Sequence, residues 1–202
     1  MAGTGAEAEG ANAIARSSYD DIMAVTSAVL TVAEFVGLPQ PSGGVRQELH
    51  HGELVELPPV KMLHTRIQMR LVSLLGAAVN PAEYGVDKEF PFRPKPEHEV
   101  WVADVAVFSL ALWERTADDD YFHGVPAIVI EVLSASNSAS EMLDREEICL
   151  RNGGREFWLV DPQRQSVKMS RADGFSIAYD VESVLESGAL GGSIAVRDIF
   201  AR

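Results

Sequence analysis

The sequence predicts an α/β domain in which a central β-sheet is flanked by helices. Three apolar runs rich in β-branched and aromatic residues, typical of strands buried on both faces, are VWVADVAVF at 100–108, AIVIEVL at 127–133 and EFWLV at 156–160. Apolar residues recur at steps of three and four over 62–78, which indicates an amphipathic helix. A second helix is predicted over 138–151, where Asn152-Gly153-Gly154 forms a stop signal. Strands alternating with helices are typical of the α/β class.

The N-terminal part predicts smaller elements. Residues 1–18 are small and polar without a period and predict a disordered tail, after which 19–202 would form a single domain. A weak helical pattern follows over 19–30. Thr31 and Glu34 have the spacing of a capping box and predict a short helix. Residues 46–57 predict a β-hairpin that turns at His51-Gly52.

The remaining segments connect these elements. Asn80-Pro81 is expected to end the helix over 62–78. Residues 86–92 predict a strand, and 111–125 predict a short helix with an acidic loop. Residues 166–171 and 176–179 predict a hairpin around Asp173-Gly174.

Composition limits the location and the partners. The formal net charge is −13, whereas a protein that coats DNA generally would be basic, so contact with nucleic acid would need a local patch such as Arg66, Arg70 and Arg93. No apolar run is long enough to cross a bilayer, which predicts no membrane partner. No secretory signal is visible, and a single cysteine, Cys149, fits a reducing cytoplasm.

Two carboxylates lie inside apolar strands. Asp104 interrupts VWVADVAVF and Glu131 interrupts AIVIEVL. An ionised carboxylate in such a place is costly unless it is paired, hydrogen-bonded or bound to a cation. The two acids on adjacent strands would suit a magnesium ion, which prefers oxygen ligands and can activate water. The alternative is that each acid lies at a strand end and pairs with Arg or Lys.

The order of motifs resembles a known family. The matching stretches, together spanning about residues 31–202, are QELHHGELVEL, His64, VADVAVF, AIVIEVLSASNS, GGREFWLVDP and SGALGGSIAVRDIF. They resemble the Uma-two family of restriction endonucleases, a branch of the PD-(D/E)XK nucleases. The resemblance implies a restriction-endonuclease-like core with a mixed sheet and an N-terminal β-hairpin. It also implies Mg²⁺ or Mn²⁺ as the cofactor and DNA as the partner.

The resemblance also implies roles for single residues. Asp104 matches the Asp of the PD element and Glu131 matches the acid of the (D/E)XK element, so both would hold the metal. His64 and Glu48 match positions near the site in the family. Their alternative interpretations are a solvent-facing histidine at a helix start and a surface acid of the hairpin.

The sequence departs from the motif where the family has lysine. Leu133 stands two residues after Glu131, and the helix position that carries lysine in this branch corresponds to Arg145. An arginine stays protonated in proteins, so Arg145 could stabilise charge on a phosphate but is a poor base. Arg145 could instead be only the ion-pair partner of Glu131 or Glu141. Lys88 is another candidate source of the missing ammonium.

The sequence leaves two hypotheses of function. The first is a magnesium-dependent DNA endonuclease with Asp104, Glu131, Arg145 and His64 as catalytic residues. The alternative is a catalytically degenerate nuclease fold that acts as a binding or regulatory module, which the acidic balance and the replaced lysine favour. The acidic, aromatic segment 113–122 is a candidate interface of a homodimer.

Overall fold

A seven-stranded mixed β-sheet forms the centre of the fold. The computed structural model describes residues 29–39, 41, 45–134 and 137–201. The strand order is β5-β3-β4-β6-β7-β8-β9. The bounds are β3 Tyr84–Arg93, β4 Trp101–Ser109, β5 Phe122–His123, β6 Ile128–Val132, β7 Glu156–Asp161, β8 Ser166–Arg171 and β9 Ser176–Tyr179. β6 and β7 are parallel and β5 runs parallel to β3, while the other neighbours are antiparallel.

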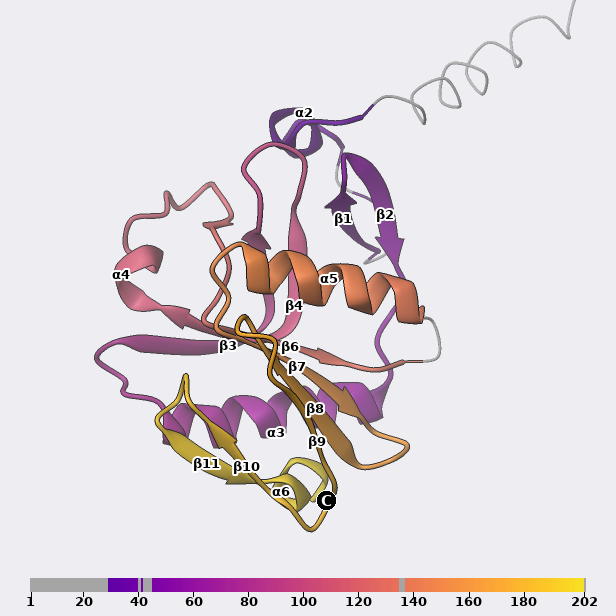
Figure 1. The fold of residues 1–202 in the computed structure, drawn as a ribbon. Coiled ribbons are helices and arrows are strands. Elements are labelled where there is room, and N and C mark those ends of the chain that lie inside the picture. Colours follow the sequence, from indigo (N-terminus) through magenta and orange to yellow (C-terminus); the bar gives the residue numbers. More distant parts are fainter. Residues whose placement is uncertain (1–28, 40, 42–44, 135–136, 202) are drawn as a thin grey trace, which may run out of the picture.

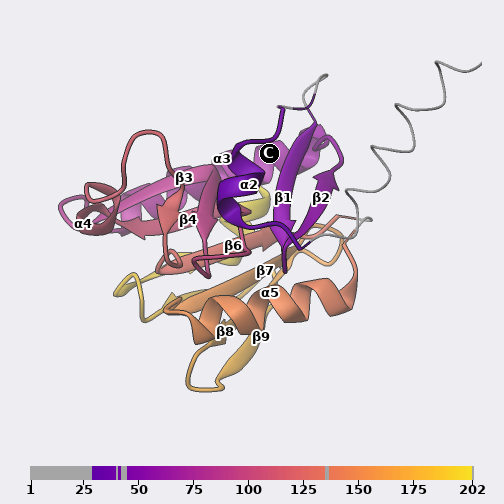
Figure 2. The ribbon, with the colours of Figure 1, turned by 90° about the horizontal axis from the view of Figure 1, so that it is seen from above.

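Helices cover both faces of this sheet (Figures 1 and 2). Helix α3 (Met62–Ala78) packs on one face, where it shares a core with α6 (Val196–Phe200) and with the two-stranded sheet of β10 (Val184–Ser187) and β11 (Gly192–Ala195). Helix α5 (Ala139–Arg151) connects β6 to β7 and covers the other face. The short α4 (Leu110–Trp113) follows β4.

An N-terminal layer lies beside the α5 face (Figure 2). It consists of α2 (Val32–Val36) and the antiparallel hairpin of β1 (Arg46–His50) and β2 (Glu53–Leu57). The hairpin joins the main sheet through a single bridge between Leu49 and Val100. These two residues form a small core with Val32 and Phe35, which fixes the position of β1 against β4.

The structure confirms most of the predicted elements. Thr31 and Glu34 form both hydrogen bonds of a capping box, and the hairpin turns at His51-Gly52 as expected. Helices α3 and α5 agree with their predicted ranges, and the mixed sheet confirms the fold class. Residues 111–125, predicted as a short helix with an acidic loop, also contain the short strand β5, while β10, β11 and α6 are short elements that no prediction covered.

Some predictions lie outside the described residues. The tail over 1–18 and nearly all of the predicted helical segment over 19–30 belong to this part of the chain. Within the described ranges, no helix is both long enough and apolar enough to cross a membrane.

Candidate metal centre

Three acids stand in one row across adjacent strands. The antiparallel ladder between β4 and β6 ends at the pair Val105 and Ile130, so Asp104 and Glu131 would form the next pair. Instead, the Asp104 carboxylate accepts a hydrogen bond of 2.7 Å from the backbone N–H of Val132. The two strands therefore separate at Asp104, and its side chain occupies the fork between them.

The third acid of the row is Glu89 on β3. In the β3–β4 ladder Lys88 pairs with Val105 and Phe90 pairs with Ala103, which places Glu89 opposite Asp104. Glu89 has a φ of 52°, a left-handed conformation that is uncommon for residues other than glycine. Such backbone outliers cluster at functional sites.

This irregularity changes which face each strand presents. On β4, the residues that reach the α5-side core are Trp101 and Ala103, and then Ala106 and Phe108. A regular strand alternates with a period of two, so the step of three residues shows that the alternation is interrupted at Asp104. As a result, Asp104 and Glu89 are both directed toward helix α3, where they meet its side chains.

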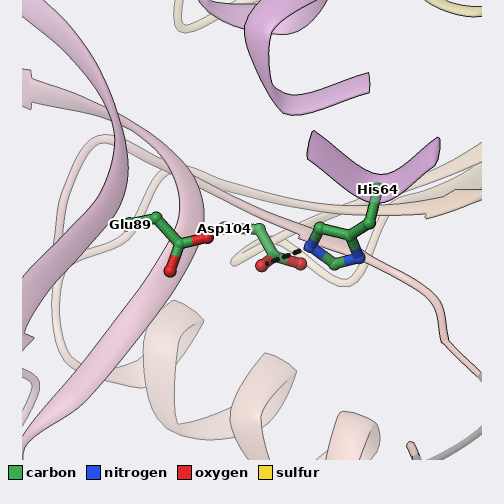
Figure 3. A group of neighbouring side chains, drawn as sticks. All are labelled: His64, Glu89 and Asp104. Atoms are coloured by element: carbon green, nitrogen blue, oxygen red, sulfur yellow. Dashed lines mark hydrogen bonds and ion pairs between the residues drawn. The ribbon is translucent and has the colours of Figure 1, made fainter. Parts of the chain in front are cut away.

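Helix α3 supplies two polar side chains, His64 and Gln68, to these acids, and Figure 3 shows His64 beside Asp104 and Glu89. His64 Nε2 lies 2.8 Å from Asp104 Oδ1. Gln68, one turn further along, donates from Nε2 to Asp104 Oδ1 at 3.1 Å and also to Glu89 Oε1. Arg46 of β1 forms an ion pair with Glu89 from outside. His64 and Gln68 of α3 thus meet Glu89 of β3 and Asp104 of β4 at one point.

The geometry of this cluster fits a divalent cation. One ligand atom each from His64, Glu89 and Asp104 lies within 4.8 Å of the other two. Two ligands of one ion at about 2.1 Å are separated by about 3 Å when adjacent and about 4 Å when opposite, so small side-chain movements suffice. The Gln68 side chain supports the fit, because its Oε1 is buried and has no hydrogen-bond partner within the described part of the chain. We refer to His64, Gln68, Glu89 and Asp104 as the α3 cluster.

Glu131 faces the opposite side of the sheet, toward α5. Its Oε1 accepts a hydrogen bond of 2.9 Å from Arg145 Nη2. Arg145 Nη1 donates to Glu48 Oε2 of β1 at 2.8 Å, and the guanidinium lies 5.0 Å from the centre of the Trp101 ring. The backbone of Val102, beyond the fork, donates to Glu48 and accepts from Arg145. Arg145 of α5 therefore connects Glu48 of β1 with Glu131 of β6 at the end where β4 and β6 separate.

The surroundings of Glu48 and Glu131 shift their pKa values in opposite directions. Burial alone would raise the pKa of Glu48, but the Arg145 guanidinium and His50 outweigh it and hold that pKa at about 2. Burial raises the pKa of Glu131 to about 8, against the opposing effect of Arg145, and the charges of Asp104 and Glu48 raise it further. One guanidinium cannot neutralise two buried carboxylates, and Glu48 has the additional donors. Burial alone would lower the pKa of Arg145, but the two acids outweigh it and raise that pKa, so the arginine stays charged.

The predicted site residues thus fall into two sets. Asp104 and His64 meet on the α3 face, while Glu131, Arg145 and Glu48 meet on the α5 face. Within the described ranges, Arg145 has Glu48 and Glu131 as its ion-pair partners and not Glu141.

Sequence reasoning missed Glu89 and Gln68. Gln68 sits one turn after His64 on the same helix face, which is a signal that could have found it. No feature of the sequence indicates the left-handed backbone conformation of Glu89.

Comparison with known proteins gives an independent result. Residues 32–191 match the Uma2 family, whose description is "Putative restriction endonuclease". A solved structure of similar fold is that of a putative nuclease belonging to DUF820 from Anabaena variabilis ATCC 29413. It has a TM-score of 0.71 and 22% sequence identity, and the match covers 85% of this chain and 97% of that chain. No curated protein matches significantly. The family match extends over most of the chain, from α2 to beyond β10, and we conclude that the chain belongs to the Uma2 family of putative restriction endonucleases.

Proposed function

We propose that this protein is a divalent-metal-dependent endonuclease that hydrolyses phosphodiester bonds of DNA, with Mg²⁺ or Mn²⁺ as its cofactor. The observation that carries the proposal is the convergence of Asp104, Glu89 and His64 at the fork where β4 and β6 separate, beside Glu131. The family and the nuclease fold support the same reaction class. A divalent ion held there would polarise the phosphate and lower the pKa of a water molecule.

The residues of the chain have distinct tasks in this proposal. The Val132 N–H and Gln68 fix the Asp104 carboxylate, so the central ligand keeps one orientation. His64 presents Nε2 to the same carboxylate, from which it can bind the ion or orient water. Arg145 holds Glu131 from behind. Whether Glu131 is a second ligand, as the motif predicts, stays a prediction that the variants below test.

Arg145 enters the proposal as a positioning residue, because its side chain is only 4% exposed and both amino groups bind protein oxygens. Lys88 is the better placed cation for a phosphate. It is exposed, and its ladder partner Val105 belongs to the core on the α3 side, so both side chains lie on the face of the α3 cluster.

DNA would approach from the start of α3. Lys61 is exposed at the start of α3, on the turn that carries His64, while Arg66 and Arg70 are exposed on the outer side of the helix, in a chain of net charge −13. Arg93 lies apart from them and is bound to Asp120. Because so few cations are available, we expect weak binding that depends on salt, with a small number of phosphate contacts.

Plasmid nicking tests this function. The native protein is expected to nick supercoiled DNA with Mg²⁺ or Mn²⁺ and to stop in EDTA, while Asp104→Asn loses at least about 100-fold in rate, since it removes the central carboxylate. Asp198→Asn, a change of the same chemistry in exposed α6, is the control and should keep full activity. Metal-independent nicking, or nicking unaffected by Asp104→Asn, would contradict the proposal.

A second candidate function is a nuclease fold without catalysis that binds a nucleic acid or protein partner. Arg145 favours it, because this residue replaces the expected lysine and binds two acids directly. In that case metal and DNA would bind to the folded protein without strand cleavage. A homodimer is likewise a prediction, and sedimentation velocity at two concentrations would test it.

A further inference from the structure

We propose that the cation is held by His64, Glu89 and Asp104, in a site with a nitrogen ligand that selects Mn²⁺-class ions over Mg²⁺, rather than by the Asp104–Glu131 pair. This inference rests on the proposed function and names its cofactor site. Three observations carry it: the geometry of the α3 cluster, the backbone at Glu89 and the Gln68 amide.

The geometry separates the two candidate ligand sets. His64, Glu89 and Asp104 bring one ligand atom each within 4.8 Å of the others, and Glu131 joins no such group of three within the described part of the chain. Glu131 is also bound to Arg145 in a different core. That ion pair, through Glu131 Oε1, holds the carboxylate on the α5 side of the sheet, opposite the side on which His64 and Glu89 lie beside Asp104.

The backbone gives the second observation. The left-handed conformation of Glu89 has an energetic cost. It occurs where the alternation of side chains between the two faces of the sheet is interrupted in both β3 and β4. Residues paired directly across a ladder share a face, so Glu89 and Asp104 lie together in any case, and the interruption decides that both face α3. The distortion brings two carboxylates to a single amide, an arrangement that a cation stabilises.

The third observation is the amide of Gln68. The side chain is 1% exposed, its nitrogen donates to both acids, and its Oε1 has no hydrogen-bond partner among the residues that the structure describes. A half-turn of the amide would present Oε1 to a cation between the acids as a further oxygen ligand. The side chain thus fills the cluster when no ion is bound and can contribute to coordination when one is.

The presence of imidazole decides the class of ion. Mg²⁺ prefers oxygen ligands almost exclusively, whereas Mn²⁺ and later transition ions accept a histidine nitrogen beside carboxylates. We therefore expect a site that binds Mn²⁺ more tightly than Mg²⁺.

The test uses Mn²⁺ itself as the probe on the full chain. Binding is measured by calorimetry and by loss of the free-ion electron paramagnetic resonance signal, and pulsed resonance detects a coupled ¹⁴N nucleus. The native protein should bind one Mn²⁺ with a nitrogen coupling. His64→Gln should abolish the coupling, and both His64→Gln and Glu89→Gln should weaken binding at least about tenfold. Circular dichroism verifies that each variant is folded.

Two controls make the result specific. His123→Gln removes another histidine that is bonded to an aspartate, Asp120, but is not part of the α3 cluster, and it should change neither affinity nor coupling. Glu131→Gln should weaken Mn²⁺ binding much less than His64→Gln or Glu89→Gln does. If Glu131→Gln abolishes binding while His64→Gln and Glu89→Gln do not, this inference fails and the proposed function survives with the motif pair as ligands. If neither Mn²⁺ nor Mg²⁺ binds to the folded protein, the proposed metal-dependent function fails as well.

Discussion

Arg145 serves two buried carboxylates at once, and this arrangement makes it the residue on which the end of the fork depends. Glu48 and Glu131 come from β1 and β6, which have no direct pairing, and the guanidinium on α5 connects them. A buried charge that loses its partner costs far more than an exposed one. Stability and site geometry are therefore coupled through this one side chain.

Replacement of Arg145 by methionine is expected to destabilise the fold by about 3–5 kcal/mol, because two buried acids then lose their partner. Urea unfolding monitored by Trp fluorescence measures the change. Arg151→Met removes an arginine from the same helix whose ion pair with Glu147 is exposed, and it should cost less than about 1 kcal/mol. Equal losses of unfolding free energy in the two variants would show that the buried ion pairs of Arg145 stabilise the fold no more than an exposed ion pair does.

Glu48 gives a prediction for acid stability. Its pKa is about 2 in the folded protein against 4.5 for an unperturbed glutamate, so its contribution is complete above pH 4.5 and is lost as the pH falls toward 2. The shift corresponds to about 3 kcal/mol. In EDTA, the difference in unfolding free energy between the native protein and Glu48→Gln should shrink by about this amount between pH 5 and pH 2.5. A constant difference over that range would contradict the assignment.

At the scale of elements, the strand β3 is the part that sets the site, because its irregular position aims Glu89. The aromatic pair Phe90 and Phe108 packs directly beside this position, with ring centres 4.4 Å apart. Phe108 in turn lies against Gly85 of the same strand β3. Packing along β3 therefore reaches the site without any polar contact.

Alanine substitutions at two glycines should have opposite effects on stability, because one glycine is tightly packed in a strand and the other is on an open helix surface. A Cβ at Gly85 would lie 2.5 Å from the Phe108 ring, so Gly85→Ala should destabilise the protein by about 1–3 kcal/mol. Gly76 lies within α3 with nothing within 4 Å of such a Cβ, so Gly76→Ala should stabilise it by about 0.5–1 kcal/mol. Thermal unfolding measures both, and a shift of the same sign in the two variants would contradict the packing seen at Gly85.

At the scale of the whole molecule, cation binding and folding should be linked. An ion that binds only the folded chain stabilises it by about 2.7 kcal/mol at 100 times its dissociation constant, which raises the melting temperature by about 5–10 °C for a domain of this size. Thermal scans in Mn²⁺ and in EDTA measure the shift. Asp104→Asn should lose the shift and Asp198→Asn should keep it, whereas an equal shift in both would indicate nonspecific screening of the net negative charge.

The sequence alone determined the fold class and most elements, since their signals are local. The 3.6-residue period of α3, the apolar runs of β4 and β6, and the turn at His51-Gly52 each depend on a few neighbouring residues. The same local signal made Asp104 and Glu131 conspicuous as acids inside apolar strands. The ordered motifs also indicated the family before any coordinates.

Only the tertiary structure decided how the polar residues are grouped. Asp104 and Glu131 are neighbours across one ladder, yet the end of pairing at Asp104 directs them to opposite faces of the sheet. Glu89 lies beside Asp104 because the two residues are opposite each other in the β3–β4 ladder, and neither this register nor the left-handed backbone at Glu89 can be predicted from a local pattern. Side-chain direction at a distorted strand depends on contacts between segments far apart in the sequence, and those contacts form only in the folded chain.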